Sequence, residues 1–214
     1  MVVVKYHMKI AITICFIVLV IFGAFTFTRH TPIQRTMEKS AKSNSRVVRT
    51  ATPDTPLDSL LHQRGLSKGD VRLHIDKSAF ILQVMHDTLV IKSYPVVLGG
   101  NPIEDKRREG DLCTPEGNFT LRNLYPHGKW SKFLWIDYPT AESWSKHNAS
   151  KAAGEIPQDA GIGGEIGIHG VPEGRDHWID EMEHWTLGCI SLKNAHIDEI
   201  YSVCQKGTVV EIVK

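Results

Sequence analysis

A histidine and a cysteine in the last quarter of the chain could together form a nucleophilic pair. His169 precedes Gly170, and Cys189 follows Gly188. A cysteine needs a base or an imidazolium partner to react as a thiolate at neutral pH, and the same imidazole can later protonate a leaving amine. The pair therefore predicts acyl transfer from a carbonyl substrate, with His169 lowering the pKa of the Cys189 thiol.

The residues around Cys189 offer a second feature of such a site. Gly188 stands before the cysteine within "HWTLGCISLKN", and its missing side chain lets a carbonyl group approach the backbone. The amides of Leu187, Gly188 and Cys189 are candidates for binding the oxyanion that forms when sulfur attacks a carbonyl. A histidine followed later by Gly-Cys is not specific by itself, so the rest of the chain has to support this interpretation.

A zinc site is the competing interpretation of this region. Its four candidate ligands are His169, His177, His184 and Cys189. They are separated by seven, six and four residues, which matches no compact zinc motif, and one loop would have to turn all four inward. We therefore expect no metal and no cofactor. The pairs His177-Trp178 and His184-Trp185 are interpreted as lid or groove residues over the cysteine.

Two further cysteines, Cys113 and Cys204, lie outside the N-terminal apolar segment. The stretch "NAHIDEIYSVCQKG" predicts a helix that is capped by Asn194 and ends near Gly207, with Cys204 on its apolar face. A buried core thiol is the expected role of Cys204. A disulfide between Cys113 and Cys204 remains an alternative, because spacing does not fix connectivity.

Short alternating apolar runs from residue 71 onward predict a mainly β fold. The first three strands are expected between Val71 and Leu98, with turns at Asp76–Ser78 and His86–Asp87. Five more strands are expected in "NFTLRNLY", "KFLWIDYP", "EIGIHG", "GCISL" and "TVVEIV". We expect a sandwich-like or barrel-like domain with one or two short helices. In this domain the histidine ends one strand and the cysteine begins the next, which brings them together.

The chain divides into three predicted parts. Ile10–Thr28 is a run of 19 residues without charge. As a helix it reaches roughly 28 Å, about one hydrocarbon thickness. Residues 1–29 are therefore predicted as a membrane anchor, with a cleaved signal peptide as the alternative. Residues 30–69 read as a polar, basic linker with a short helix at "LDSLLHQRG", and residues 70–214 as the catalytic domain.

The overall charge balance excludes a field that would recruit nucleic acid. The sequence has 25 Lys and Arg against 24 Asp and Glu. A local basic run, Lys106–Arg108, either attracts carboxylates of a substrate or is simply solvated. Glu109 and Asp111 are each interpreted as forming ion pairs with the basic residues of this run.

The two motifs, in this order, resemble the catalytic domain of the L,D-transpeptidases, the YkuD-type family. The resemblance is carried by His169-Gly170 and by Thr186-x-Gly188-Cys189-Ile190, with Asn194 after them. It extends upstream to the Arg-Glu-Gly-Asp and Thr-Pro-Glu-Gly stretch within residues 94–119, and it covers roughly residues 71–214. It implies an envelope enzyme whose cysteine attacks a peptidoglycan stem tetrapeptide before D-alanine. The acyl group then passes to an amine.

Carried over residue by residue, the resemblance implies a role for each member of the pair. Cys189 is the nucleophile, His169 is the general base and acid, and Gly170 supplies a backbone carbonyl that orients the imidazole. The resemblance also implies β-lactams of the carbapenem type as inhibitors. It further implies a role in cell-wall organisation and cell shape, with the catalytic domain in the periplasm and the N-terminal helix in the inner membrane.

Three positions near the cysteine bear on substrate recognition. Thr186 stands where the family has Ser or Thr. Leu187 occupies a position often filled by histidine, and Ser191 one where many members carry arginine. A guanidinium there could hold a substrate carboxylate or buttress the site. Its absence concerns recognition more than chemistry.

Two other functions remain open at this point. A hydrolase with the same site, either an L,D-carboxypeptidase or an amidase that releases wall-linked protein, would give the acyl group to water. A non-catalytic wall-binding module is the more distant alternative. The intact histidine–cysteine pair argues against it, since a binding module does not need one.

Overall fold

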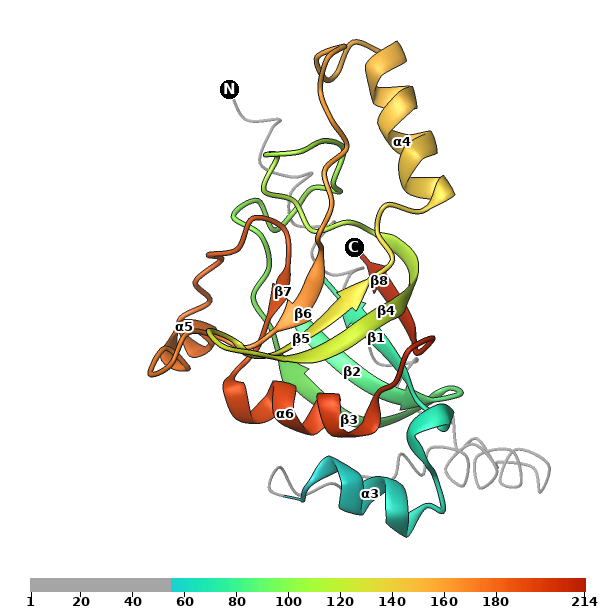
Figure 1. Cartoon of the computed structure of the whole chain (residues 1–214), viewed down its shortest axis with the longest axis vertical. Coiled ribbons are helices and arrows are strands. Elements are labelled where there is room, and N and C mark those ends of the chain that lie inside the picture. The colour runs from blue at the N-terminus through green and yellow to red at the C-terminus, as the bar shows by residue number, and fades with distance from the viewer. Residues whose placement is uncertain (1–54) are drawn as a thin grey trace, which may run out of the picture. The chain divides into compact units, whose positions relative to one another are not determined.

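Eight strands form one mixed sheet in the part of the chain that the computed structural model describes, residues 55–214 (Figure 1). Their spatial order is β3, β2, β1, β8, β4, β5, β6, β7. Their bounds are β1 Arg72–Asp76, β2 Ile81–His86, β3 Leu89–Pro95, β4 Gly117–His127, β5 Ser131–Ile136, β6 Gly167–His169, β7 Ile190–Ser191 and β8 Val209–Val213. Two hydrogen bonds of 3.0 and 2.8 Å between Val97 and Ser191 join the two ends of this order. The predicted mainly β, barrel-like fold is confirmed.

The long strand β4 connects the two halves of the sheet. Its residues 117–120 pair with β8, and residues 121–127 pair with β5. The register shifts between Leu121 and Asn123, and such a bulge bends a strand. β4 thereby leads the chain from the half formed by β1, β2, β3 and β8 to the half formed by β5, β6 and β7. The second half carries the histidine and the cysteine.

The expected turns between the first three strands are present. Asp76 closes the first turn, because its carboxylate accepts hydrogen bonds from the Ser78 hydroxyl at 2.7 Å and from the Ala79 amide at 2.9 Å. Asp87 lies between β2 and β3 with a positive φ of 49°. The third strand ends at Pro95, earlier than predicted, and the chain then leaves β2 to bridge to β7.

Helices α3 (Leu57–Gln63) and α6 (Asn194–Val203) pack against each other, α3 also against β3 and α6 against β5 and β6 (Figure 1). The three leucines of α3 are at most 3% exposed and belong to the same core as the buried isoleucines of α6. A helix this short needs a docking partner to persist. The packed part of the chain therefore begins upstream of residue 70.

The ends of α6 differ from the prediction. Lys193, not Asn194, occupies the N-cap, and no Lys193 side-chain bond caps the helix. The backbone amide of Asn194 instead donates a hydrogen bond to the Asp176 carboxylate at 2.8 Å. Asp176 lies 18 residues away in the sequence, so sequence proximity does not reveal this partner. The helix ends at Val203. Cys204 follows it as a core thiol, 4% exposed, as expected.

Two helices were not predicted, α4 (Ala141–Ala152) and the short α5 (His177–Asp180). The buried residues of α4 are Ser143, His147 and Ser150, so the helix has no apolar stripe to reveal it. It stands apart from the sheet in Figure 1. It is tied to the loop after β3 by His147 Nδ1 with the Arg107 carbonyl at 2.6 Å, and by Lys146 with Asp105 at 3.0 Å. A single turn of 3-10 helix, Lys68–Asp70, precedes β1.

The predicted anchor, residues 1–29, and most of the predicted linker lie outside the described residues. Within residues 55–214, no helix is both long and apolar enough to cross a membrane. The three cysteines of this part, Cys113, Cys189 and Cys204, are all free thiols. The disulfide alternative is therefore not found in the structure.

Candidate active site

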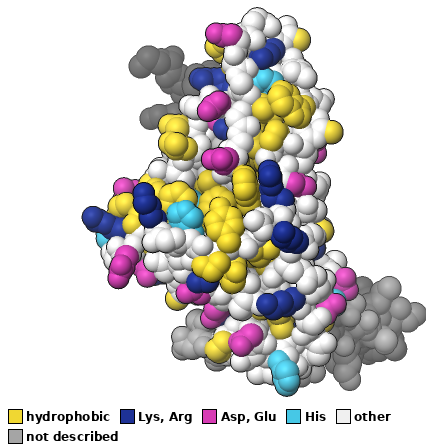
Figure 2. Space-filling view, in the orientation of Figure 1, with side chains coloured by type: hydrophobic (Ala, Val, Ile, Leu, Met, Phe, Trp, Pro, Cys, Tyr) yellow, Lys and Arg dark blue, Asp and Glu magenta, His cyan; other side chains and the backbone are white. Residues whose placement is uncertain are grey.

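His169 and Cys189 line one pocket of about 810 Å³. The pocket lies among the ends of β6 and β7, the β4–β5 hairpin and the loop around residues 106–112. Five aromatic residues of the hairpin form one wall: Tyr125, His127, Trp130, Phe133 and Trp135. Figure 2 shows hydrophobic side chains gathered in the middle of the face where Figure 1 draws β5 and β6. The structure thus brings the two predicted catalytic residues into one partly apolar pocket.

Backbone pairing and one hydrogen bond fix the His169 ring. His169 ends β6, opposite Phe133 in β5 and Ser191 in β7. Its Nδ1 lies 2.7 Å from the carbonyl oxygen of Gly170. A carbonyl only accepts hydrogen bonds, so Nδ1 carries the proton and Nε2 keeps its lone pair. The imidazole is therefore oriented as a base, and the carbonyl predicted to orient it is in place.

Aromatic rings surround His169. Its ring stacks on Trp130 with centroids 4.4 Å apart and lies parallel to Phe133 at 5.7 Å, while Trp185 meets it edge-on at 5.5 Å. Burial among these rings lowers the pKa of His169 to about 4, against the raising effect of the Gly170 hydrogen bond. The imidazole is consequently neutral at pH 7.

Two glycines allow this close packing. A Cβ on Gly167 would lie 2.5 Å from the Phe133 ring. A Cβ on Gly170 would collide with the Asn194 side chain and with the Trp130 carbonyl. Since Gly170 also donates its amide to the Trp130 carbonyl at 3.0 Å, the residue that holds the imidazole is itself held in place.

Cys189 lies immediately before β7, with its thiol 3.6 Å from the carbonyl oxygen of Glu165. Burial raises the pKa of this thiol to about 11, while a hydrogen bond from the Gly167 amide and the charge of Lys106 act in the opposite direction. The expectation that His169 lowers this pKa is therefore wrong for the resting site. Burial disfavours both charged forms, so this pocket holds a neutral thiol and a neutral imidazole at rest.

The turn before the cysteine is locked by Thr186. Its hydroxyl donates to the Cys189 carbonyl at 2.7 Å and accepts a hydrogen bond from the Gly188 amide at 3.2 Å. Gly188 has φ +138°, and a Cβ there would lie 2.7 Å from the Cys113 carbonyl oxygen. Only glycine fits this position without displacing the neighbouring loop.

The hydrogen bond from the Gly188 amide to the Thr186 hydroxyl changes the predicted oxyanion site. The Gly188 amide, one of the three expected donors, is occupied by Thr186. Within residues 55–214, the amides of Leu187 and Cys189 make no hydrogen bond. Leu187 is 77% exposed and lines the pocket. These two amides are the donors that remain for an oxyanion.

Ser191 is a site residue whose contact sequence reasoning missed. It is fully buried, and its hydroxyl donates at 3.2 Å to the Gly170 carbonyl oxygen, the acceptor that His169 also uses. The sequence marked this position only for its missing arginine. Its pairing with His169 across β6 and β7 is the signal that would have revealed the contact.

Of the four predicted lid or groove residues, only Trp185 lines the pocket. Trp178 packs behind it, with ring centroids 5.4 Å apart. The Nδ1 atom of His184 accepts the Leu98 amide at 3.0 Å, which makes His184 a structural acceptor. His177 lies on α5 outside the pocket lining. In the part of the chain that the structure describes, no three His, Cys, Asp or Glu side chains gather into a metal-binding group.

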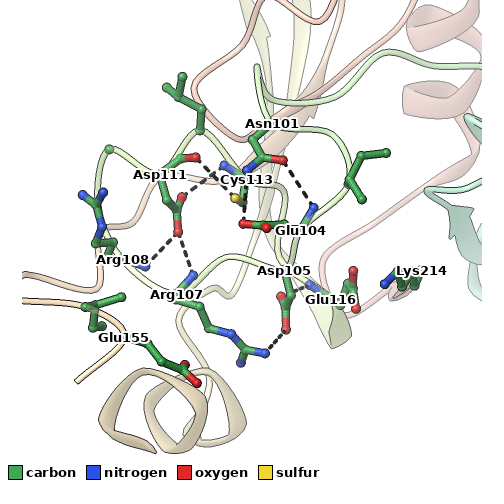
Figure 3. Close-up of a pocket in the computed structure, with 14 residues that line it drawn as sticks. Asn101, Glu104, Asp105, Arg107, Arg108, Asp111, Cys113, Glu116, Glu155 and Lys214 are labelled. Carbon is green, nitrogen blue, oxygen red and sulfur yellow. Dashed lines mark hydrogen bonds and ion pairs between the residues drawn. The ribbon is translucent and has the colours of Figure 1, made fainter. Parts of the chain in front are cut away.

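The loop between β3 and β4 is held by Asp111 (Figure 3). Its carboxylate accepts hydrogen bonds from the amides of Arg107, Arg108 and Cys113 at 2.7, 2.8 and 3.1 Å, and it pairs with Lys106 at 2.9 Å. Burial alone would raise the pKa of Asp111, but these hydrogen bonds hold it below its usual value. Of the two carboxylates predicted to form loop ion pairs, Asp111 pairs with Lys106, whereas Glu109 makes no ion pair within residues 55–214. A second pocket, about 650 Å³, lies on this loop.

A model of the L,D-transpeptidase catalytic domain family, YkuD, matches residues 70–212. The chain belongs to this family. The match begins just before β1 and ends within β8, so the L,D-transpeptidase domain comprises the whole sheet. No curated protein sequence matches the chain.

Several solved structures are similar to this L,D-transpeptidase domain. Bd1075 of Bdellovibrio bacteriovorus is 17% identical with a TM-score of 0.49, and the match covers 70% of this chain and 49% of that one. The helical cell shape determining protein Pgp2 of Campylobacter jejuni is 23% identical with a TM-score of 0.49, covering 74% and 55%. An L,D-transpeptidase from Mycobacterium smegmatis is 17% identical with a TM-score of 0.41, covering 68% and 59%. The chain thus spans about half the length of the first two.

Proposed function

We propose that this L,D-transpeptidase family member is a peptidoglycan acyltransferase with Cys189 as its nucleophile. Its donor is a stem tetrapeptide, cleaved before the C-terminal D-alanine, and its acceptor is an amine of the cell wall or of a protein. The observation that carries the proposal is the His169 hydrogen bond to Gly170, which leaves Nε2 as the basic nitrogen in the pocket shared with Cys189. The family match supports the substrate class.

The neutral resting pair suits general-base attack. As the Cys189 sulfur bonds to the substrate carbonyl carbon, its proton passes to His169 Nε2, and the amides of Leu187 and Cys189 receive the oxyanion. The carbon–nitrogen bond then breaks, and the D-alanine amine leaves with the proton that the imidazole returns. An acceptor amine attacks the thioester, its proton passes through His169, and the Cys189 thiol is restored. The imidazolium of His169 and the oxyanion of the substrate arise together and only during the reaction. Their mutual attraction limits the free-energy cost of creating two charges in a buried site.

A product analysis tests this proposal. The purified full chain is incubated with disaccharide tetrapeptide, and the products are separated and weighed by mass spectrometry. Cross-linked dimers with free D-alanine are expected, and Cys189→Ala should form none. Cys204→Ala is the matched control, because it removes a core thiol that the pocket does not contain. Tripeptide as the sole product would replace transfer by hydrolysis, and unchanged substrate would favour a wall-binding module.

We further propose that residues 1–29 anchor the chain in the inner membrane and that the catalytic domain acts in the periplasm. The uncharged run Ile10–Thr28 supports this, together with the envelope substrate. Protease added to spheroplasts should degrade the catalytic domain. In untreated cells the chain should sediment with the membranes. A protease-resistant domain that remains in the cytoplasmic fraction would contradict the proposed location.

A further inference from the structure

Lys106 is a buried lysine that lines the pocket of Cys189. Its side chain is 3% exposed, and it lines the same pocket as the cysteine and the histidine. Its Nζ donates to the Arg108 carbonyl at 2.9 Å and to Asp111 Oδ1 at 2.9 Å. An ammonium has three N–H donors. The third donor of Lys106 has no acceptor within residues 55–214.

A second buried lysine, Lys77 in the turn between β1 and β2, shows what full pairing looks like. Lys77 is 1% exposed, and its Nζ donates to the Glu104 carbonyl, the Thr114 carbonyl and the Glu116 carboxylate at 2.7, 3.2 and 2.8 Å. All three donors are used, and Lys77 lies outside the catalytic pocket. A buried donor without a partner costs free energy, so the unused donor of Lys106 calls for an acceptor.

The position of Lys106 is fixed before any ligand arrives. Asp111, its ion-pair partner, is held by three backbone amides, and Lys106 also bonds the backbone of its own loop. The charge of Lys106 reaches the cysteine, since it lowers the pKa of the Cys189 thiol against the effect of burial. Two carboxylates, Glu109 and Glu165, also line the pocket, and Lys106 is the one Lys or Arg among its lining residues.

We propose that Lys106 is the carboxylate-binding residue of this pocket and selects peptide substrates that carry a carboxylate near the bond to be cleaved. This rests on the proposed function for the substrate, and it adds a specificity determinant. The missing arginine two residues after the cysteine leaves that task open, because Ser191 is neutral and bonded to Gly170. The carboxylate comes from one of two places: the C-terminus of the leaving residue, or the side chain of the residue before it.

Alkylation of Cys189 tests the anion site without any peptide. Iodoacetate and iodoacetamide both form a carbon–sulfur bond and release iodide, and they differ in carrying a carboxylate or a neutral amide. The ratio of their rates on Cys189 is measured by peptide mass mapping for wild type, Lys106→Met, Lys106→Arg and Lys206→Met. Lys206 is an exposed lysine outside the pocket lining, so its variant controls for net charge.

The ratio of iodoacetate to iodoacetamide rate should be at least about tenfold higher in wild type than in Lys106→Met, the scale of one hydrogen bond to a charged group. Lys106→Arg and Lys206→Met should keep the wild-type ratio. Each ratio is taken within one protein, so a general change in the loop cancels. Equal ratios in wild type and Lys106→Met would overturn the proposal. If Lys106→Met does not fold, a wild-type ratio no higher than that of free cysteine overturns it.

Amidated substrates identify the source of the carboxylate. The kcat/KM of the full chain is compared for disaccharide tetrapeptide, for its C-terminal amide, and for a tetrapeptide amidated on the side chain of its third residue. One of the two amidated substrates should have a kcat/KM at least about tenfold lower than the unmodified tetrapeptide in wild type. The same substrate should show little reduction in Lys106→Met. No reduction with either amide would overturn the proposal while leaving the proposed function intact. No turnover of any tetrapeptide would instead contradict the proposed function, and the alkylation ratio would still decide on the anion site.

Discussion

Ser191 donates its hydroxyl to the carbonyl oxygen of Gly170 at 3.2 Å, and this same oxygen receives the Nδ1 proton of His169 at 2.7 Å. One carbonyl thus joins the β7 side chain to the imidazole at the end of β6. The backbone of Gly170 is also held at its amide, which donates a hydrogen bond to the Trp130 carbonyl. The orientation of the base is consequently determined by backbone groups and one buried hydroxyl.

Ser191→Ala should lower kcat by about fivefold and leave KM nearly unchanged. The change removes one hydrogen bond worth about 1 kcal/mol from the carbonyl that orients His169, and no group that touches the substrate. Steady-state kinetics on disaccharide tetrapeptide provide the measurement. Ser202→Ala, on the exposed side of α6, is the control. An unchanged kcat in Ser191→Ala would show that the His169 ring does not depend on this contact.

The pH profile of Cys189 acylation should be broad. The reactive form has a neutral imidazole and a neutral thiol, so the rate rises as pH passes the His169 pKa of about 4 and declines only near the Cys189 pKa of about 11. A thiolate–imidazolium pair would instead lose activity as the imidazolium deprotonates. Acylation by a carbapenem, followed by intact protein mass across this pH range, separates the two. A decline beginning near neutral pH would contradict the neutral pair.

His169 should also make the fold less stable in mild acid. Its folded pKa of about 4 lies below the usual value of 6.5, so the unfolded chain binds the proton first as pH falls. The stability contributed by the neutral ring is present above pH 6.5 and is lost progressively toward pH 4, by about 3 kcal/mol in total. Urea unfolding of wild type and of His169→Asn, an uncharged side chain that keeps a donor near Nδ1, measures this.

Other groups titrate in the same range, so the difference between the two proteins is the relevant quantity. Wild type should lose more unfolding free energy than His169→Asn between pH 6.5 and pH 4. Equal losses in both proteins would mean that His169 titrates normally in the folded state.

Gly188→Ala should reduce Cys189 acylation by at least about tenfold and destabilise the domain by about 1–3 kcal/mol. At φ +138° an L side chain is strained, and the added Cβ would lie 2.7 Å from the Cys113 carbonyl. Gly128→Ala in the β4–β5 turn, where a Cβ meets nothing within 4 Å, is the control and should behave like wild type. Thermal unfolding and acylation rates serve as readouts, and a wild-type rate in Gly188→Ala would show that this turn can relax.

The sequence predicted best the strands in which buried residues alternate with more accessible ones, as in β1 and β8; in β1, Leu73 and Ile75 are the buried residues. It did not predict α4, whose buried side chains are polar and whose N-terminus is marked only by a Thr140–Ser143 capping box. A helix that docks through ion pairs and a histidine leaves no apolar period to detect. Short or polar helices of this kind become visible only once their partners are placed.

Motif order predicted that His169 and Cys189 form a pair, but it did not predict their electrostatics. The pKa expected for Cys189 assumed that the imidazole would dominate its surroundings, whereas burial raises this pKa. The burial of His169 depends on Trp130 and Phe133, which come from a hairpin about forty residues upstream. Ser191 and Lys106 were both noticed in the sequence. Their partners, Gly170 and Asp111, became clear only from the fold.

Trapping the acyl-enzyme shows directly whether Cys189 carries the acyl group. The full chain is mixed with disaccharide tetrapeptide, quenched in acid within the first turnover, digested and mapped by mass spectrometry. The peptide containing Cys189 should gain the mass of the substrate less that of D-alanine, as a thioester that hydroxylamine removes. An adduct on Cys113 or Cys204 instead, or D-alanine release by Cys189→Ala at the wild-type rate, would contradict it.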